Sequence, residues 1–177
     1  MQSKLNKTAI LFSFFFSLFL LLQTADLTAG GWGKNDHICE HEGTIWNGVY
    51  FDMNGLNFSA SIPNYSGTSL QNGIVSINGN VKEDGYVIIT SFNSGFTPQK
   101  SAKEFAKMIQ DANPNYLVNI VECKKLGAKY AVDMIPINSN DTAFWRFLST
   151  NDRLIKMGSD DANANRRLYF FESIFIH

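Results

Sequence analysis

Three side chains with metal-binding chemistry alternate near the start of the chain, at His37, Cys39 and His41. In an extended strand, alternate residues project from the same face, so the three would lie on one side. Imidazole and thiolate are ligands that suit Zn²⁺ or copper. Ligands spaced this tightly seldom complete a tetrahedron alone, and a fourth donor is not evident. Two interpretations follow: a metal site, serving a metal carrier or a metal-dependent enzyme, or a polar, flexible N-terminal segment that a disulfide at Cys39 ties down.

The chain has two cysteines, Cys39 and Cys123. An oxidising compartment would let them pair, and the disulfide would close a loop of about 85 residues. On the chain-entropy account, such a bridge stabilises the fold by roughly 4 kcal/mol. Cys39 cannot bridge to Cys123 and also bind a metal as thiolate. The sequence leaves both a Cys39–Cys123 disulfide and two free thiols open.

Other catalytic arrangements find little support. Outside the segment with His37 and His41, the chain has one histidine, His177, so a serine or cysteine nucleophile lacks a convincing base. Most of the carboxylates fall in predicted turns or helix caps, where aspartate serves backbone hydrogen bonding. We therefore expect no enzyme activity.

Aromatic and arginine side chains gather late in the chain, at Trp145, Arg146 and Arg153. These residue types dominate binding hot spots, so the three are candidate contacts to a partner. Packing in the core and at its rim is the alternative for residues that alternate along a strand. The net charge is −1 with acids and bases mixed along the chain, which argues against a nucleic-acid partner.

The N-terminus has the pattern of a secretory signal peptide over residues 1–29. Lys4 and Lys7 precede an uncharged, strongly apolar run of 14 residues at positions 9–22. A helix of that length rises about 21 Å, less than the roughly 30 Å of a bilayer core, which favours a cleaved leader over a permanent span. The alternative is an uncleaved anchor. Cleavage predicts a secreted or periplasmic protein with no stable membrane anchor.

The rest of the chain divides into an N-terminal segment, 30–50, and one domain, 51–177. Asparagine, glycine and serine form turn signals at Asn54-Gly55, Asn72-Gly73, Asn78-Gly79 and Ser94-Gly95. Alternating and β-branched stretches between turns predict strands. The expected strands are 56–62, 73–81, 86–92, 116–124, 127–135, 143–150 and 153–157.

Two helices are expected between and after these strands. One starts after an N-cap at Thr97 or at Ser101, and ends near Ala112 ahead of Pro114. The other starts after a cap at Asp160 or Asp161 and places Leu168, Phe171 and Phe175 on one face, with a strand over 168–176 as the alternative. The order predicts an α+β fold, in which a central and a C-terminal helix pack on an antiparallel sheet.

Several segments of the span 56–176 resemble the fold family that includes the photosystem II extrinsic protein PsbP, the periplasmic protein DcrB and a Ran-binding nuclear import factor. The similar stretches are LNFSASIP, SAKEFAKMIQDA, VNIVECKKLGAKYAVDM, FWRFLSTNDRLIKMG and RRLYFFESIF. Members of this family bind partners of many kinds, so the resemblance implies a non-catalytic binding module.

The leading hypothesis is therefore an exported, non-catalytic binding or accessory protein with a protein or small-ligand partner. Its alternatives are a metal protein that uses His37, Cys39 and His41, and a structural component of the cell envelope.

Overall fold

The computed structural model describes residues 31–53, 56–91, 96–138 and 142–177, and for residues 31–37, Met53 and Lys125 it describes the backbone. The predicted signal peptide, 1–29, lies outside the described residues, as do the turn signals at Asn54-Gly55 and Ser94-Gly95. Within the described ranges, no helix is both long enough and apolar enough to cross a membrane.

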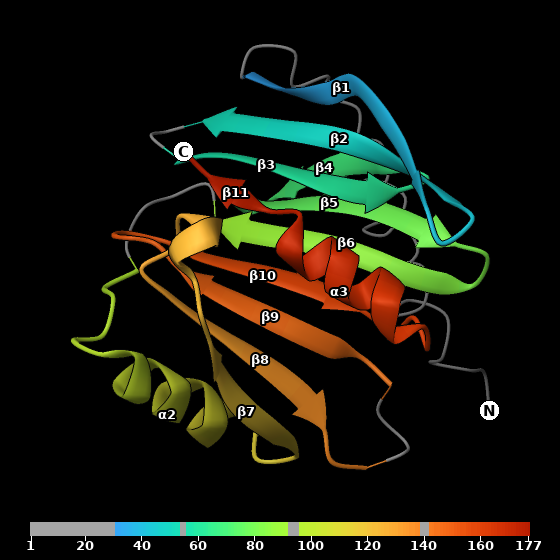
Figure 1. Cartoon of the computed structure of the whole chain (residues 1–177). Coiled ribbons are helices and arrows are strands. Elements are labelled where there is room, and N and C mark those ends of the chain that lie inside the picture. The colour runs from blue at the N-terminus through green and yellow to red at the C-terminus, as the bar shows by residue number, and fades with distance from the viewer. Residues whose placement is uncertain (1–30, 54–55, 92–95, 139–141) are drawn as a thin grey trace, which may run out of the picture.

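The chain is α+β, as the sequence predicts, and its described strands form two antiparallel sheets (Figure 1). The small sheet has the order β1 (Gly31–His41), β2 (Thr44–Met53), β3 (Leu56–Pro63) and β11 (Phe175–Ile176). The large sheet has the order β4 (Gly67–Gln71), β5 (Ile74–Val81), β6 (Asp84–Ser91), β10 (Leu154–Ser159), β9 (Phe144–Ser149), β8 (Tyr130–Pro136) and β7 (Tyr116–Val121).

One face of the large sheet, which we call the inner face, packs against the small sheet and helix α3 (Ala164–Glu172). Ile77, Ile88 and Met157 point to this face and join one core with Phe58 of β3 and Phe170 of α3. Buried and less buried residues alternate along β3 and β5. The period-two pattern of the sequence therefore reports the packing of the two sheets.

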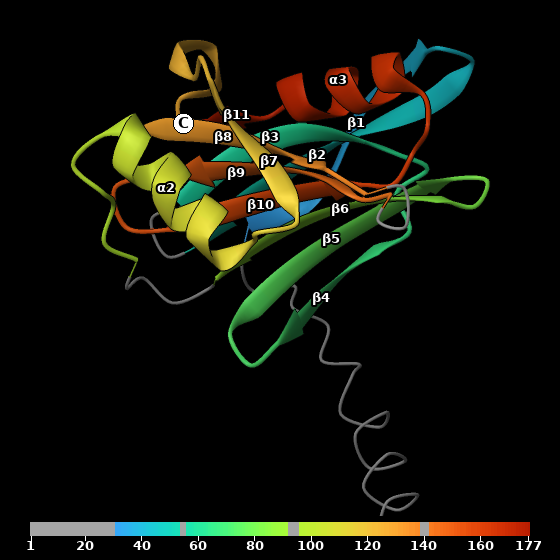
Figure 2. The same cartoon turned by 90° about the horizontal axis from the view of Figure 1, so that it is seen from below.

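The opposite, outer face of the large sheet is covered at one end by helix α2 (Ala102–Ala112). Phe105 and Ile109 of α2 pack against Val132, Met134 and Phe147 of the sheet. Figure 2 shows α2 beside β7 and β8, whereas β4 and β5 extend to the other end of the sheet, away from this helix. The margin of this cluster is formed by Trp145 of β9 and Leu154 of β10, and the outer face over β5 and β6 lies beyond it.

Helix α2 starts at the second of its two predicted caps. The hydroxyl of Ser101 accepts a hydrogen bond from the backbone N–H of Glu104 at 3.2 Å, and the Glu104 carboxylate accepts one from the N–H of Lys100. This reciprocal capping satisfies donors that a helix start otherwise leaves unpaired. Asn113 caps the other end.

The C-terminal helix forms, but its cap and buried face differ from the prediction. Asn163 is the N-cap of α3, because its side chain accepts from the N–H groups of Asn165 and Arg166. Phe170 and Phe171 are buried, whereas Leu168 is 52% exposed. Phe175 belongs to the short strand β11. The predicted helix therefore forms, and of the competing strand over 168–176 the part Phe175–Ile176 is extended.

The turn predicted at Asn78-Gly79 is wrong, whereas the strand predicted over 73–81 forms as β5, and two strands form in the N-terminal segment. Asn72 and Gly73 do turn, between β4 and β5, but Asn78-Gly79 lies inside β5. Glycine is needed there because a Cβ on Gly79 would lie 2.2 Å from the carbonyl oxygen of Pro63, where β3 crosses β5. Residues 31–53 form β1 and β2, and Trp46 of β2 is fully buried.

Candidate binding site

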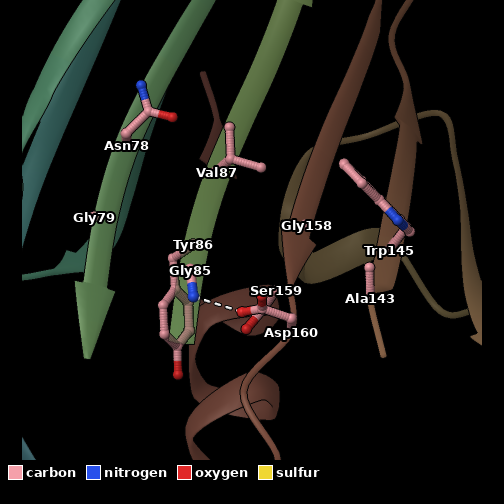
Figure 3. Close-up of a pocket in the computed structure, with 10 residues that line it drawn as sticks. All are labelled: Asn78, Gly79, Gly85, Tyr86, Val87, Ala143, Trp145, Gly158, Ser159 and Asp160. Carbon is pink, nitrogen blue, oxygen red and sulfur yellow. Dashed lines mark hydrogen bonds between the residues drawn. The ribbon is translucent and has the colours of Figure 1, made fainter. Parts of the chain in front are cut away.

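A row of four residues crosses the outer face of the large sheet, from β5 to the margin of the cluster under α2. Asn78 of β5 is paired with Val87 of β6, Val87 with Gly158 of β10, and Gly158 with Trp145 of β9. Because paired residues of neighbouring strands point to the same face, these four side-chain positions form one continuous strip. Figure 3 shows the side chains of Asn78, Val87 and Trp145 on this strip.

The indole of Trp145 lies directly on Gly158. A Cβ added to Gly158 would meet three consecutive atoms of the six-membered ring, Cζ3, Cε3 and Cη2, at 2.6, 2.8 and 2.9 Å. Three nearly equal distances place this position over the face of the ring and not beyond its edge. The missing side chain of Gly158 therefore makes the room in which the indole lies flat against the sheet.

All four residues of the strip line a pocket of about 250 Å³ (Figure 3). The hairpin residue Gly85 and the strand exit at Asp160 form its rim, and the Gly85 N–H donates to the Asp160 carboxylate. The lining residues are Asn78, Gly79, Gly85, Tyr86, Val87, Ala143, Trp145, Gly158, Ser159 and Asp160. An aromatic wall, an amide and a carboxylate thus surround a floor of small residues.

A buried ionic network fixes the rim from the inner side of the sheet. The Tyr86 hydroxyl donates to Asp161, whose carboxylate also accepts two bonds from the Arg166 guanidinium. Burial alone would raise the pKa of Asp161, but the hydrogen bonds from Arg166, Tyr86 and the Asn163 N–H outweigh it and hold that pKa below its usual value. Burial and the bond to Asp161 raise the pKa of Tyr86, so its hydroxyl stays protonated.

Of the three predicted contact residues, the structure places Trp145 at the pocket and the two arginines in the interior. Arg146 is 2% exposed and faces inward, where it binds Asp133 and donates to the Phe171 carbonyl oxygen at 3.0 Å. Arg153 is also 2% exposed, with its Nε 3.6 Å from an oxygen of Asp152. We therefore keep Trp145 as the candidate contact.

The predicted metal ligands lie on β1 beside helix α3. The Cys39 Sγ is 2.9 Å from the Tyr169 hydroxyl, and the His41 ring stacks on the Tyr169 ring with centroids 4.2 Å apart. Of His37 only the backbone is described. In the described parts of the chain, no three His, Cys, Asp or Glu side chains are arranged to hold a metal ion. A Zn²⁺ or copper site here stays a prediction.

Of the two alternatives that the sequence leaves open, a Cys39–Cys123 disulfide and two free thiols, the structure has free thiols. Cys39 is engaged with Tyr169 of α3, whereas the Cys123 thiol donates to the carbonyl oxygen of Lys129 at 3.4 Å. The Cys39 sulfur in β1 and the Cys123 sulfur after β7 therefore contact different partners, Tyr169 and Lys129.

A larger hollow of about 540 Å³ lies between the β1–β2 hairpin and α3, with Leu168, Tyr169 and Glu172 among its lining residues. Two of its ring-bearing residues, His41 and Tyr169, are stacked on each other. The pocket at Trp145 instead is built on paired strands, and elements of this kind hold side chains more firmly than loops do.

Most of the pocket is not evident from the sequence. Trp145 stands out by its residue type, but Asn78-Gly79 gives a turn signal inside the predicted strand 73–81, and Gly158 has no predicted role. A glycine inside a β-rich stretch, as in KMGSD, is a signal that something approaches the strand closely. Comparisons with models of protein families, with curated proteins and with solved structures found no match to this chain.

Proposed function

We propose that this chain is an exported, non-catalytic binding protein, and that its ligand occupies the pocket at Trp145. The observation that carries the proposal is the indole of Trp145 lying flat on Gly158 at the edge of an open pocket. Ligand sites commonly combine an apolar or aromatic wall with a few convergent polar groups, and this pocket has both. Export is supported by the pattern of residues 1–29.

The chemistry of the pocket supports binding more than turnover. Among its lining residues, Asp160 is the carboxylate and there is no histidine, cysteine, lysine or arginine. The Tyr86 hydroxyl is occupied by Asp161 on the far side of the sheet. Acid–base catalysis needs a group that can exchange a proton with the ligand, and general acid–base pairs need two.

The relationship to PsbP-like proteins belongs to the same proposal and rests on the sequence segments named above.

The proposal is tested on the full-length chain, expressed from its complete coding sequence in its own organism and purified without denaturation. Native mass spectrometry then shows the N-terminal residue and any molecule retained by the protein. A thermal-shift screen over sugars, peptides, nucleosides and lipid headgroups covers ligands lost during purification. We expect at least one class to bind, with binding lost in Trp145→Ala.

The matched control is Asn80→Ala, since the Asn80 side chain projects from the same face of β5 but bonds the Lys82 carbonyl oxygen outside the pocket. Asn80→Ala should bind as the unmodified chain does. Binding that survives Trp145→Ala, or turnover of any of these compounds, would contradict the proposal. A chain that binds none of the four classes would contradict it as well.

A further inference from the structure

We propose that the ligand of the Trp145 pocket is a neutral carbohydrate, bound through one sugar ring against the indole. This inference rests on the proposed function, because it names the ligand class of the same pocket. A sugar ring has an apolar face of C–H groups and a perimeter of hydroxyl groups that both donate and accept hydrogen bonds. A complementary site therefore needs a flat aromatic surface and planar polar groups at its edge.

The aromatic surface is supplied by Trp145 and fixed before any ligand arrives. Gly158 supports the indole from below, and the neighbouring residues on β9 and β10 are regular strand. A ring held in place costs little conformational entropy when a ligand stacks on it. Within the described chain, the indole N–H donates to no other residue, so it can also serve a hydroxyl group.

The polar edge is formed by Asn78 and Asp160, on opposite sides of the pocket (Figure 3). One oxygen of Asp160 accepts from Gly85, and the second oxygen has no hydrogen-bond partner among the described residues. The Asn78 oxygen accepts from Ser76 at 3.3 Å, while its amide N–H groups bond no described residue. The pocket thus offers a hydroxyl-bearing ligand both acceptors and donors.

The charge of the pocket distinguishes a neutral sugar from an anionic ligand. Its lining holds the carboxylate of Asp160 and no cationic side chain. Lys156 is on the same face of β10, but its ammonium group lies over the Phe147 ring, 5.6 Å from the centroid. Phosphate, sulfate and carboxylate ligands require cations or clustered N–H donors, so this site disfavours them.

The surface next to the pocket can take further sugar units. Ser69 and Ser76 are paired across β4 and β5 on the outer face, and Asn78 follows on the same face of β5. A row of hydroxyl and amide groups on an open sheet suits an extended chain of hydroxyl-rich units. A pocket of about 250 Å³ holds one ring, and the row continues from it.

A glycan array with neutral and anionic glycans, probed with the full-length chain, tests the inference, followed by calorimetry with the neutral oligosaccharide that binds best. We expect neutral glycans to bind, with at least about a tenfold loss of affinity in Trp145→Ala. Trp145→Phe keeps an aromatic plane and should lose less. Asn78→Ala should weaken binding, whereas the matched control Asn80→Ala should weaken it little, because only Asn78 lines the pocket.

Circular dichroism and thermal unfolding confirm that each variant is folded. If Trp145 governs the binding of a peptide or a lipid headgroup instead, the carbohydrate inference is overturned and the proposed function stands. If anionic glycans bind in preference to neutral ones, the inference is also overturned. If no ligand of any class depends on Trp145, both fail.

Discussion

Arg146 of β9 and Asp133 of β8 form a two-point ion pair across neighbouring strands, with Nε 2.6 Å from Oδ1 and Nη2 2.9 Å from Oδ2. A third nitrogen donates to the Phe171 carbonyl oxygen, and the guanidinium lies over the Phe171 ring. One side chain thereby joins the inner face of the large sheet to the end of helix α3.

Replacing Arg146 with alanine should lower the free energy of unfolding by about 2–4 kcal/mol. The loss leaves the Asp133 carboxylate and a helix carbonyl without their charged donor in a partly buried place. Urea denaturation measures the change. As the control, Lys107→Ala breaks an exposed pair with Asp111 in α2 and should cost less than about 0.5 kcal/mol. Equal effects of the two substitutions would contradict this account.

Gly79→Ala should destabilise the contact between the two sheets by about 1–3 kcal/mol. The new methyl group would lie 2.2 Å from the Pro63 carbonyl oxygen, so β3 and β5 must separate. The matched control is Gly85→Ala, whose methyl group would be 3.6 Å from Asp160 Oδ1, an ordinary contact. The melting temperature should fall for Gly79→Ala and stay nearly unchanged for Gly85→Ala. A similar fall for both variants would show that the close approach at Gly79 is unimportant.

Gly158→Ala should displace the Trp145 indole while leaving the strand intact. The added Cβ would come within 3 Å of three ring atoms, and the ring must tilt off the sheet to avoid it. We expect a change in near-ultraviolet circular dichroism and weaker binding of any Trp145-dependent ligand, with little change in far-ultraviolet spectra. Unchanged affinity would mean that the flat position of the indole is not what the ligand recognises.

Stability should fall in acid, in part through Asp161. The pKa of Asp161 is lower in the folded state than in the unfolded chain, so the unfolded chain takes up a proton first as the pH drops. The stabilisation that ionised Asp161 provides is complete above its ordinary pKa. It is lost as the pH falls through that ordinary pKa and then through the lower pKa of the folded state. Asp84 acts in the opposite direction, because partial burial and then the carboxylates of Asp161 and Asp160 raise its pKa.

Urea denaturation between roughly pH 6 and pH 2 should therefore show a shallower decline in the free energy of unfolding for Asp161→Asn than for the unmodified chain. The slope of the free energy of unfolding against pH reports proton uptake. Loss of the ion pair with Arg166 instead lowers stability at every pH and leaves the slope unchanged. Parallel curves would exclude Asp161 as a source of the pH dependence.

Both cysteines should react as thiols. In the protein unfolded without reductant, iodoacetamide should add two labels, one at Cys39 and one at Cys123, because neither is bridged in the structure. In the folded protein the Cys39 label should form more slowly, since its sulfur is partly buried against Tyr169. Intact mass spectrometry gives the count, and a chain that takes a label only after reduction would show that a disulfide does form.

Local patterns in the sequence predict the elements of this fold well. Alternation predicts β3, and the spacing of Ser101 and Glu104 predicts the start of α2. What could not be predicted depends on residues distant in sequence. Gly79 looks like a turn because Pro63, whose oxygen it must accommodate, lies on another sheet. Arg146 looks like a surface contact because Asp133 and Phe171, which bury it, come from other elements.

In the candidate site, too, local sequence identifies part of the site, and contacts between distant residues supply the rest. Trp145 could be identified from its residue type alone. Asn78, Gly158 and Asp160 become neighbours only through the pairing of β5, β6, β10 and β9, which joins segments separated by more than half of the domain.

That pairing also makes completion of the fold depend on the end of the chain. Tyr86 of β6 meets Ser159 of β10, and Phe58 of β3 meets Ile176 of β11, so neither sheet is complete until the last strands have been synthesised. Contacts this remote along a chain slow folding, because the intervening loop must close first. For a chain exported as proposed above, slow closure of the sheets would leave more time for the unfolded polypeptide to pass through a translocation channel.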